Sequence, residues 1–339
     1  MITTFTTTAL LLTLQLTMQF SGTTARLRGV SAVNNRVAWA SGSNSTVLRT
    51  TDGGATWKKL DVTTDKLDLR DIDAIDARTA YVLAIGNGDA SRIYKTTDAG
   101  ATWTLQFKNE EAQAFYDAMS FWDADHGIVI GDSIAGRFCV LTTDDGGRTW
   151  NRIPAASLPA ALPNEGAFAA SGTNIALWGS SHAWIATGGA AKSRVLRTAD
   201  RGRTWNIAEV PLAAGSSTGA FSVAFRDRLH GVIVGGDYTK ESEAMNNIAV
   251  TRDGGITWFL SKGLSGYRSV VAYVPSARKT KTLVAIGPAG IDFSSDDGET
   301  WQRAKGPGFD TLSFVRARTR NAVGWAAGNN GALGKLVIK

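Results

Sequence analysis

The chain has 339 residues, of which 43% are hydrophobic and 37 are glycine, so it can bury a sizeable core and make many tight turns. Its net charge of +6 is mild and its basic residues are scattered without a nucleic-acid motif, so we expect no nucleic-acid partner. The single cysteine, Cys139, excludes an internal disulfide, and the three histidines are not spaced as metal ligands; we expect no metal and no cofactor.

The chain begins with a threonine-rich segment, residues 1–12, that contains a short apolar run from Ala9 to Leu12. The run is too short to cross a bilayer, and we predict no transmembrane segment. We interpret residues 1–12 as a signal remnant or a disordered leader. On this basis we expect a location in the cell envelope, either periplasmic or extracellular, with the cytoplasm as the alternative.

Residues 13–20 alternate strictly between polar and apolar side chains, with Leu14, Leu16, Met18 and Phe20 on one side. This alternation predicts a β-strand. The strand precedes the first repeat described below, so it has no sheet of its own at this point of the chain.

An eight-residue block, first seen as TTDGGATW from Thr50 to Trp57, occurs six times with the pattern Ser/Thr-x-Asp-x-Gly-x-Thr-Trp. The pattern is typical of a hairpin turn, because the Asp accepts backbone N–H groups and the Gly allows a positive φ. The Trp that follows can bury a large surface. We therefore interpret the repeated aspartates as structural turn anchors: Asp52, Asp98, Asp145, Asp200, Asp253 and Asp296.

Successive copies of the block are separated by about 43 to 55 residues, which suits a four-stranded blade of a β-propeller. The sequence predicts an all-β, seven-bladed propeller of antiparallel blades that forms a single domain over residues 13–339. The predicted blades are 26–62, 68–108, 114–154, 165–210, 218–262, 267–305 and 309–338.

The last predicted blade, 309–338, has no turn block and no fourth strand. The strand at 13–20 can supply what is missing. Closing the ring in this way would remove two unpaired sheet edges. We therefore predict that the N-terminal strand closes the propeller.

The turn block resembles the Asp-box, or BNR repeat, of sialidases and other propellers. Over residues 13–338, repeated units such as ARLRGVSAVNNRVAWASGSNSTVLRTTDGGATW resemble the photosystem II stability/assembly factor family, the Ycf48-like proteins. The resemblance implies a non-catalytic propeller that assists assembly of a membrane complex. Separately, we expect a monomer that binds an acidic or membrane-associated protein. Related sequences occur without photosynthesis, so photosynthesis itself is not implied.

Propeller topology divides the loops between two faces, and ligands generally bind at the mouth of the central channel. The starts of the innermost strands and the loops after the second strands carry charged and aromatic residues, which we predict to form a binding funnel. An alternative is a solvated rim of mutually paired charges. The predicted funnel residues are Arg70, Asp71, Tyr116, Asp117, Asp132, Glu165, Asp237, Tyr238, Tyr267 and Arg268.

The alternative function is a carbohydrate-active propeller, either a sialidase-like or other glycoside hydrolase or a glycan-binding protein. Glycoside hydrolysis requires two carboxyl groups about 5–9.5 Å apart, and the candidates are Asp117, Asp132, Glu165 and Asp237. The one Arg-Ile-Pro tripeptide, residues 152–154, follows the third Asp-box instead of preceding the first, which argues against a sialidase. We therefore favour a non-catalytic scaffold.

The opposite face is predicted to carry a basic docking arc on the turns of blades 4 to 7. Such an arc could dock an acidic protein segment or anionic headgroups. A solubilising role is the simpler alternative. The predicted members of the arc are Arg201, Arg203, Arg226, Arg228, Arg278, Lys279, Lys281, Arg316, Arg318 and Arg320.

Overall fold

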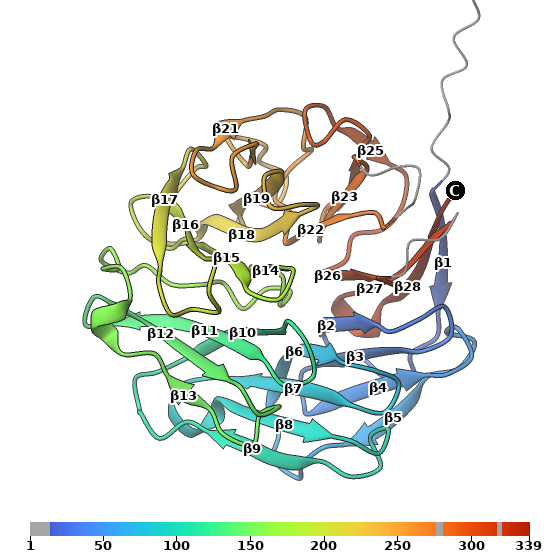
Figure 1. Ribbon diagram of the computed structural model, residues 1–339. Helices are drawn as coiled ribbons and strands as arrows, with labels where there is room; N and C mark the ends of the chain where they lie inside the picture. The colour runs from blue at the N-terminus through green and yellow to red at the C-terminus, as the bar shows by residue number, and fades with distance from the viewer. Residues whose placement is uncertain (1–13, 276–280, 317–320) are drawn as a thin grey trace, which may run out of the picture.

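The computed structural model describes residues 14–275, 281–316 and 321–339. Seven four-stranded antiparallel sheets stand around a common centre, as Figure 1 shows. Between the strands the described residues contain only three short 3-10 turns, η1 (Gly88–Ala90), η2 (Ala155–Ser157) and η3 (Asn329–Gly331). The predicted seven-bladed propeller is confirmed. Within the described ranges, no helix is long and apolar enough to span a membrane.

In blades 1 to 6 the strands follow one another from the centre of the ring to its periphery. Their bounds are β2 (Leu27–Ala32), β3 (Ala38–Gly42), β4 (Thr46–Thr50) and β5 (Lys58–Asp61); β6 (Asp68–Ala74), β7 (Ala80–Ile85), β8 (Arg92–Thr96) and β9 (Thr104–Lys108); β10 (Tyr116–Phe121), β11 (Gly127–Ile134), β12 (Arg137–Thr143) and β13 (Asn151–Arg152); β14 (Ile175–Trp178), β15 (His182–Thr187), β16 (Ser193–Thr198) and β17 (Asn206–Val210); β18 (Thr218–Phe225), β19 (Gly231–Asp237), β20 (Ile248–Thr251) and β21 (Phe259–Leu260); β22 (Val270–Tyr273), β23 (Leu283–Gly287), β24 (Gly290–Ser294) and β25 (Gln302–Ala304).

Blade 7 consists of β26 (Thr311–Phe314), β27 (Ala322–Ala327) and β28 (Leu333–Ile338), with β1 (Leu14–Gln19) as its outermost strand. β1 runs antiparallel to β28, so the two ends of the described chain close the ring, as predicted. Leu14 and Leu16 pack against the core between blades 6 and 7. Met18 and Phe20 are exposed instead, because the strand extends beyond that core. Only the first half of the apolar row is therefore used in packing.

The closing strand also bonds to blade 1. The Gln19 side-chain amide donates to the carbonyl of Gly53 at 3.2 Å, and its oxygen accepts the Trp57 indole N–H at 3.1 Å. Lys335 on β28 donates to the same Gly53 carbonyl at 3.0 Å. The first Asp-box thus joins blade 1 to blade 7.

All six Asp-boxes make the same four hydrogen bonds. In the first, Asp52 accepts the Thr50 hydroxyl and both the backbone N–H and the hydroxyl of Thr56, while Gly54 N–H donates to the Thr50 oxygen. The other five repeat this set. These bonds stabilise the ionised carboxylates; those from Thr102, for example, lower the pKa of Asp98 to about 2.

Aromatic side chains connect neighbouring blades. Tyr81 of β7 stacks on Phe121 of β10 with ring centroids 4.0 Å apart, and the Asp-box Trp150 meets Phe121 edge-on at 5.9 Å. Trp184 and Phe225 repeat the stacking between blades 4 and 5 at 3.7 Å. Because each Asp-box tryptophan packs between sheets, the turn block fixes the spacing of blades as well as the turn.

Candidate functional site

A segment between blades 3 and 4, residues 166–174, crosses the centre of the ring; we call it the central segment. Its backbone carbonyls accept hydrogen bonds from Arg28 at 3.4 Å, Arg70 at 3.0 Å and Thr311 at 3.0 Å. Its Ser171 hydroxyl donates to the Ser269 carbonyl at 2.8 Å. The segment is thereby bonded to the innermost parts of blades 1, 2, 6 and 7. One pocket is lined by residues 167–170 and another by residues 171–173, so a pocket lies on each side of the segment.

The first pocket, which we call the mouth pocket, has a volume of about 480 Å³. This lies within the range of about 300–1,000 Å³ that is usual for ligand sites. It is lined by three arginines, four acidic residues and an aromatic wall: Arg26, Arg28, Arg70, Asp117, Asp132, Glu241, Asp310, Phe115, Phe168, Phe221, Tyr238 and Tyr267, with Ala167, Ala169, Ala170 and Pro288.

β-Bulges place four of these side chains in the pocket. In the innermost strands of blades 1, 2, 3 and 5, one residue near the beginning of the strand is left out of the pairing with the second strand. The residues skipped are Arg28, Arg70, Asp117 and Phe221, and all four line the mouth pocket. A bulge re-aims one side chain without breaking the sheet, so the repeated fold delivers one functional side chain per bulged blade.

The three arginines of the pocket differ in their partners. Arg26 makes two hydrogen bonds to Asp310, at 2.8 and 2.9 Å, and Arg70 contacts Asp68 at 2.8 Å. Arg28 has no carboxylate of the described chain within ion-pair distance, and its buried Nε has no hydrogen-bond partner. Burial, together with the neighbouring Arg70 charge, lowers the pKa of Arg28. Arg28 is therefore a partly desolvated guanidinium that lines the pocket and has an unused hydrogen-bond donor, its Nε, among the described contacts.

Asp117 and Asp132 lie together in the same pocket. Asp117 is only 2% exposed, and its Oδ2 has no hydrogen-bond partner among the described residues. Burial raises the pKa of Asp117 well above its usual range, and the nearby Asp132 raises it further. Burial also raises the pKa of Asp132, to about 6. Near neutral pH the pair therefore carries less than its full negative charge.

The aromatic wall is rigid on one side and accessible on the other. Phe168 of the central segment stacks on Phe221 at 3.9 Å with an interplanar angle of 4°. Tyr238 meets both rings edge-on at 6.3 and 6.1 Å, and about half of its surface is exposed. Tyr267 packs edge-on against Phe221 at 4.8 Å. The pocket therefore offers a partly exposed tyrosine beside the Arg28 guanidinium.

The structure brings together five of the ten predicted funnel residues, and they line the mouth pocket: Arg70, Asp117, Asp132, Tyr238 and Tyr267.

Four of the remaining predicted residues do not line the mouth pocket and contact other residues instead. Glu165 has a fully buried side chain in an ion pair with Arg194. Arg268 is fully buried against Asp292 at 2.6 Å. Tyr116 packs edge-on against Phe107, and Asp237 accepts two hydrogen bonds from Thr239 in its own loop.

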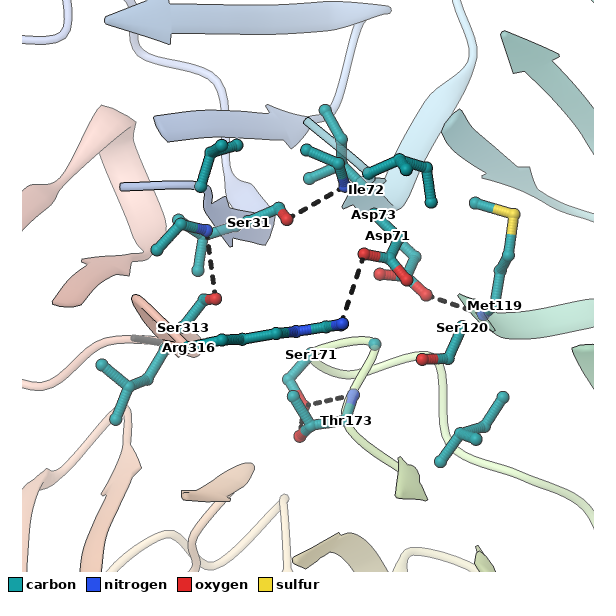
Figure 2. Close-up of a pocket in the computed structure, with 18 residues that line it drawn as sticks. Ser31, Asp71, Ile72, Asp73, Met119, Ser120, Ser171, Thr173, Ser313 and Arg316 are labelled. Atoms are coloured by element: carbon teal, nitrogen blue, oxygen red, sulfur yellow. Dashed lines mark hydrogen bonds and ion pairs between the residues drawn. The ribbon is translucent and has the colours of Figure 1, made fainter. Parts of the chain in front are cut away.

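The tenth residue, Asp71, lies on the far side of the central segment in a pocket of about 220 Å³ (Figure 2). Its carboxyl group accepts the Met119 backbone N–H at 2.7 Å, and burial raises its pKa well above the usual range. Figure 2 shows Arg316 extended across this pocket toward Asp73, 4.0 Å away. The pocket is otherwise lined by hydroxyls that bond to backbone, such as Ser31 and Ser313, so it serves mainly to join blades.

Of the four carboxylates considered for glycoside hydrolysis, Asp117 and Asp132 share the mouth pocket. Glu165 has both oxygens engaged, by Arg194, Thr187 and the Leu162 N–H. Asp237 is held within an exposed loop. Asp117 and Asp132 are therefore the two of these four carboxylates that line the mouth pocket.

The described part of the basic arc is weaker in charge than its sequence suggests. Arg226 is neutralised by Asp297 at 2.7 Å and by Asp227 at 2.5 Å. Arg201 donates to the Ser180 carbonyl, whereas Arg203, Arg228 and Lys281 are exposed. Arg278, Lys279, Arg318 and Arg320 lie outside the described residues.

A family model for the photosystem II assembly factor YCF48 matches residues 15–114, which span the closing strand and the first two blades. This chain is an Asp-box propeller that resembles the Ycf48-like assembly factors. The match covers less than a third of the chain. No curated protein matches its sequence.

Several solved structures share the fold. A structure of YCF48 bound to a D1 peptide is 19% identical with a TM-score of 0.65, covering 95% of this chain and 96% of that one. YCF48 from Cyanidioschyzon merolae is 14% identical, with a TM-score of 0.58 and coverages of 94% and 98%. A GH74 xyloglucanase from Xanthomonas campestris is also 14% identical, with a TM-score of 0.58. That match covers 93% of this chain and 60% of the xyloglucanase chain. At these identities the likeness establishes the fold.

The raised pKa of Asp132 gives a pH-dependent prediction. Between the unfolded pKa of about 4 and the folded pKa of about 6, the folded carboxyl keeps its proton while the unfolded one loses it. Stability from this residue is thus present below pH 4 and is lost as pH rises through 6. Asp132→Asn should therefore raise the free energy of unfolding by about 1–2 kcal/mol at pH 8 and leave it unchanged near pH 4. Denaturant unfolding of both proteins between about pH 4 and pH 8 measures the change in the free energy of unfolding. A change that does not vary with pH would contradict the raised pKa of Asp132.

Proposed function

We propose that this protein is a non-catalytic propeller that binds a segment of a partner protein in the mouth pocket and acts as an assembly or stability factor. The observation that carries the proposal is the Arg28 guanidinium, which lacks an ion-pair partner among the described residues, beside an accessible aromatic wall. The YCF48 structure with a bound D1 peptide supports peptide binding by a propeller of this kind. We also propose the cell envelope as its location, based on residues 1–12 alone.

The chemistry of the pocket indicates what the segment should contain. A guanidinium with free donors binds a carboxylate through charge-assisted hydrogen bonds. Tyr238 and the Phe168–Phe221 stack offer apolar and edge surfaces to a neighbouring side chain. We therefore propose a segment in which an acidic residue or a terminal carboxylate lies next to an aromatic or aliphatic residue. The basic arc is the less favoured surface for this segment, because Arg226 is already neutralised.

The test is a selection of binding sequences from a library of random peptides displayed on phage. We expect selected peptides to combine a carboxylate with an apolar neighbour. Arg28→Ala should weaken their binding about 10- to 100-fold, the worth of a hydrogen bond to a charged group. Binding should also tighten as pH falls through 6, because protonation of Asp132 removes a negative charge from the pocket.

The matched control is Arg148→Ala, which removes the same charge from an exposed Asp-box turn. Both variants should first be shown to melt like the wild type, since Arg28 also holds the Ala170 carbonyl. Selected peptides that bind Arg28→Ala as tightly as the wild type, or that lose binding in Arg148→Ala, would refute the assignment to the mouth pocket.

One observation favours the glycoside-hydrolase alternative. Asp117 and Asp132 share a pocket, and burial raises the pKa of both carboxyl groups. A carboxyl group with a raised pKa can hold the proton that a general acid donates. Hydrolysis of aryl glycosides that disappears in Asp117→Asn, with peptide binding unaffected by Arg28→Ala, would establish this alternative in place of the scaffold.

A further inference from the structure

Blade 5 exposes four large apolar side chains on two of its turns and on its outermost strand. Leu229 is 53% exposed, Ile256 54%, Phe259 61% and Leu260 46%; we call these four residues the blade 5 rim. Leu229 lies in the turn between β18 and β19, Ile256 lies in the Asp-box, and Phe259 and Leu260 form the outermost strand β21. The two turns are in contact, because Gly254 N–H donates to the Leu229 carbonyl at 2.9 Å. β21 lies at the periphery of the ring (Figure 1).

The other blades provide an internal comparison for Leu229. In each of blades 1 to 6, an N–H of the Asp-box donates to a carbonyl of the turn after the innermost strand, so this hydrogen bond identifies equivalent residues. Where blade 5 has Leu229, the others have polar or charged residues: Arg36, Arg78, Asp125, Ser181 and Lys281.

The same comparison holds for Ile256 and Phe259. The position before the last Thr of the Asp-box is Ile256 in blade 5, and elsewhere it is Ala55, Ala101, Arg148, Arg203 and Glu299. The position after the Asp-box tryptophan is Phe259 in blade 5, and elsewhere it is Lys58, Thr104, Asn151, Asn206 and Gln302. Five blades fold with small or polar residues at both positions. The fold therefore does not require apolar side chains at these two positions, and Ile256 and Phe259 remain more than half exposed.

Cations accompany the rim. Arg228 is adjacent to Leu229 and Lys262 follows β21; both are exposed, and no described carboxylate lies within ion-pair distance of either. Asp227, which is adjacent to Arg228 in the sequence, binds Arg226 and His230, and Glu299 binds Arg252. The rim thus combines protruding apolar groups with uncompensated positive charge.

We propose that the blade 5 rim docks the propeller on an anionic lipid bilayer. Apolar side chains flanked by cations are the combination that inserts into the interfacial region of such membranes. A bilayer needs no complementary groove, which suits side chains that protrude from turns and from an edge strand. None of the four residues or their cations lines the mouth pocket, so docking would leave that pocket free. This inference does not depend on the proposed function.

The test uses flotation of the full chain with vesicles of phosphatidylcholine alone or with one third phosphatidylglycerol. The wild type should float with the anionic vesicles. The variant Phe259→Lys/Leu260→Lys installs the Lys58–Lys59 pair of blade 1 at the equivalent positions of blade 5. It increases positive charge, so purely electrostatic attraction would strengthen its binding, whereas insertion of apolar groups predicts a loss of about tenfold or more.

Phe20→Lys is the matched control, because Phe20 is 89% exposed but lies on the closing strand's end instead of on blade 5. It should float like the wild type. Arg228→Ala/Lys262→Ala should weaken binding to the anionic vesicles and make it less sensitive to salt. A wild type that binds neither vesicle, or a double lysine variant that binds as well as the wild type, would overturn the proposal and leave a protein partner as the occupant of the rim.

Discussion

Removal of residues 14–19 is expected to abolish cooperative folding of the ring. These residues form β1, which pairs along its whole length with β28 and covers the core between blades 6 and 7 with Leu14 and Leu16. Without them, β28 becomes an exposed sheet edge beside an uncovered apolar surface, which favours aggregation. The loss also removes the Gln19 bonds to blade 1, which weakens the contact between blades 7 and 1 that Lys335 and Arg26 still make.

The measurement is thermal unfolding followed by circular dichroism, together with size-exclusion chromatography. The truncated chain should aggregate or melt over a broad range. Gln19→Ala keeps the strand but removes its hydrogen bonds to Gly53 and Trp57. It should lower the free energy of unfolding by about 0.5–1.5 kcal/mol per hydrogen bond lost. Phe20→Ala should change nothing, because the side chain is exposed. A truncated chain that stays monomeric and melts as sharply as the full chain would show that β1 is dispensable for closure.

Replacement of Arg268 by methionine is expected to lower the free energy of unfolding by about 3–5 kcal/mol, the usual cost of breaking a buried ion pair. Both members of the Arg268–Asp292 pair are fully buried, and Arg268 also bonds to the Tyr267 carbonyl at 2.7 Å and to the Ser265 hydroxyl at 2.5 Å. Arg268→Met would leave the buried Asp292 carboxylate without its counter-ion. Equilibrium unfolding in urea measures the loss.

Two further variants identify the cause. Arg268→Met/Asp292→Asn removes both charges and should recover part of the loss, because no buried charge remains unpaired. Arg303→Met removes a nearby cation on β25 that bonds only to the Ala289 carbonyl among the contacts described, at 2.9 Å, and should cost less than about 1.5 kcal/mol. A double variant less stable than Arg268→Met would show that packing of the arginine stem, and not charge pairing, holds this site.

The sequence alone determined the propeller, the number of blades and the means of closure. The Asp-box could be interpreted from sequence because its hydrogen bonds join residues two to four positions apart, as between Thr50, Asp52 and Thr56. Such local chemistry is the same in every copy and does not depend on what surrounds it. The missing Asp-box of the last blade and the unassigned strand at residues 14–19 then left one arrangement that pairs every edge.

Only the tertiary structure decided which polar residues line the mouth pocket. Arg70 lies near the start of the innermost strand β6 and Arg268 lies just before the innermost strand β22, yet Arg70 lines the pocket and Arg268 is buried against Asp292, 24 positions away. Arg28 and Phe221 were not recognised from sequence, although an alignment of the repeats would have placed them beside Arg70 and Asp117 at the bulged position. A one-residue bulge reverses the direction of a side chain. The bulges and the central segment arise from contacts between blades that are distant in sequence, so local patterns could not reveal them.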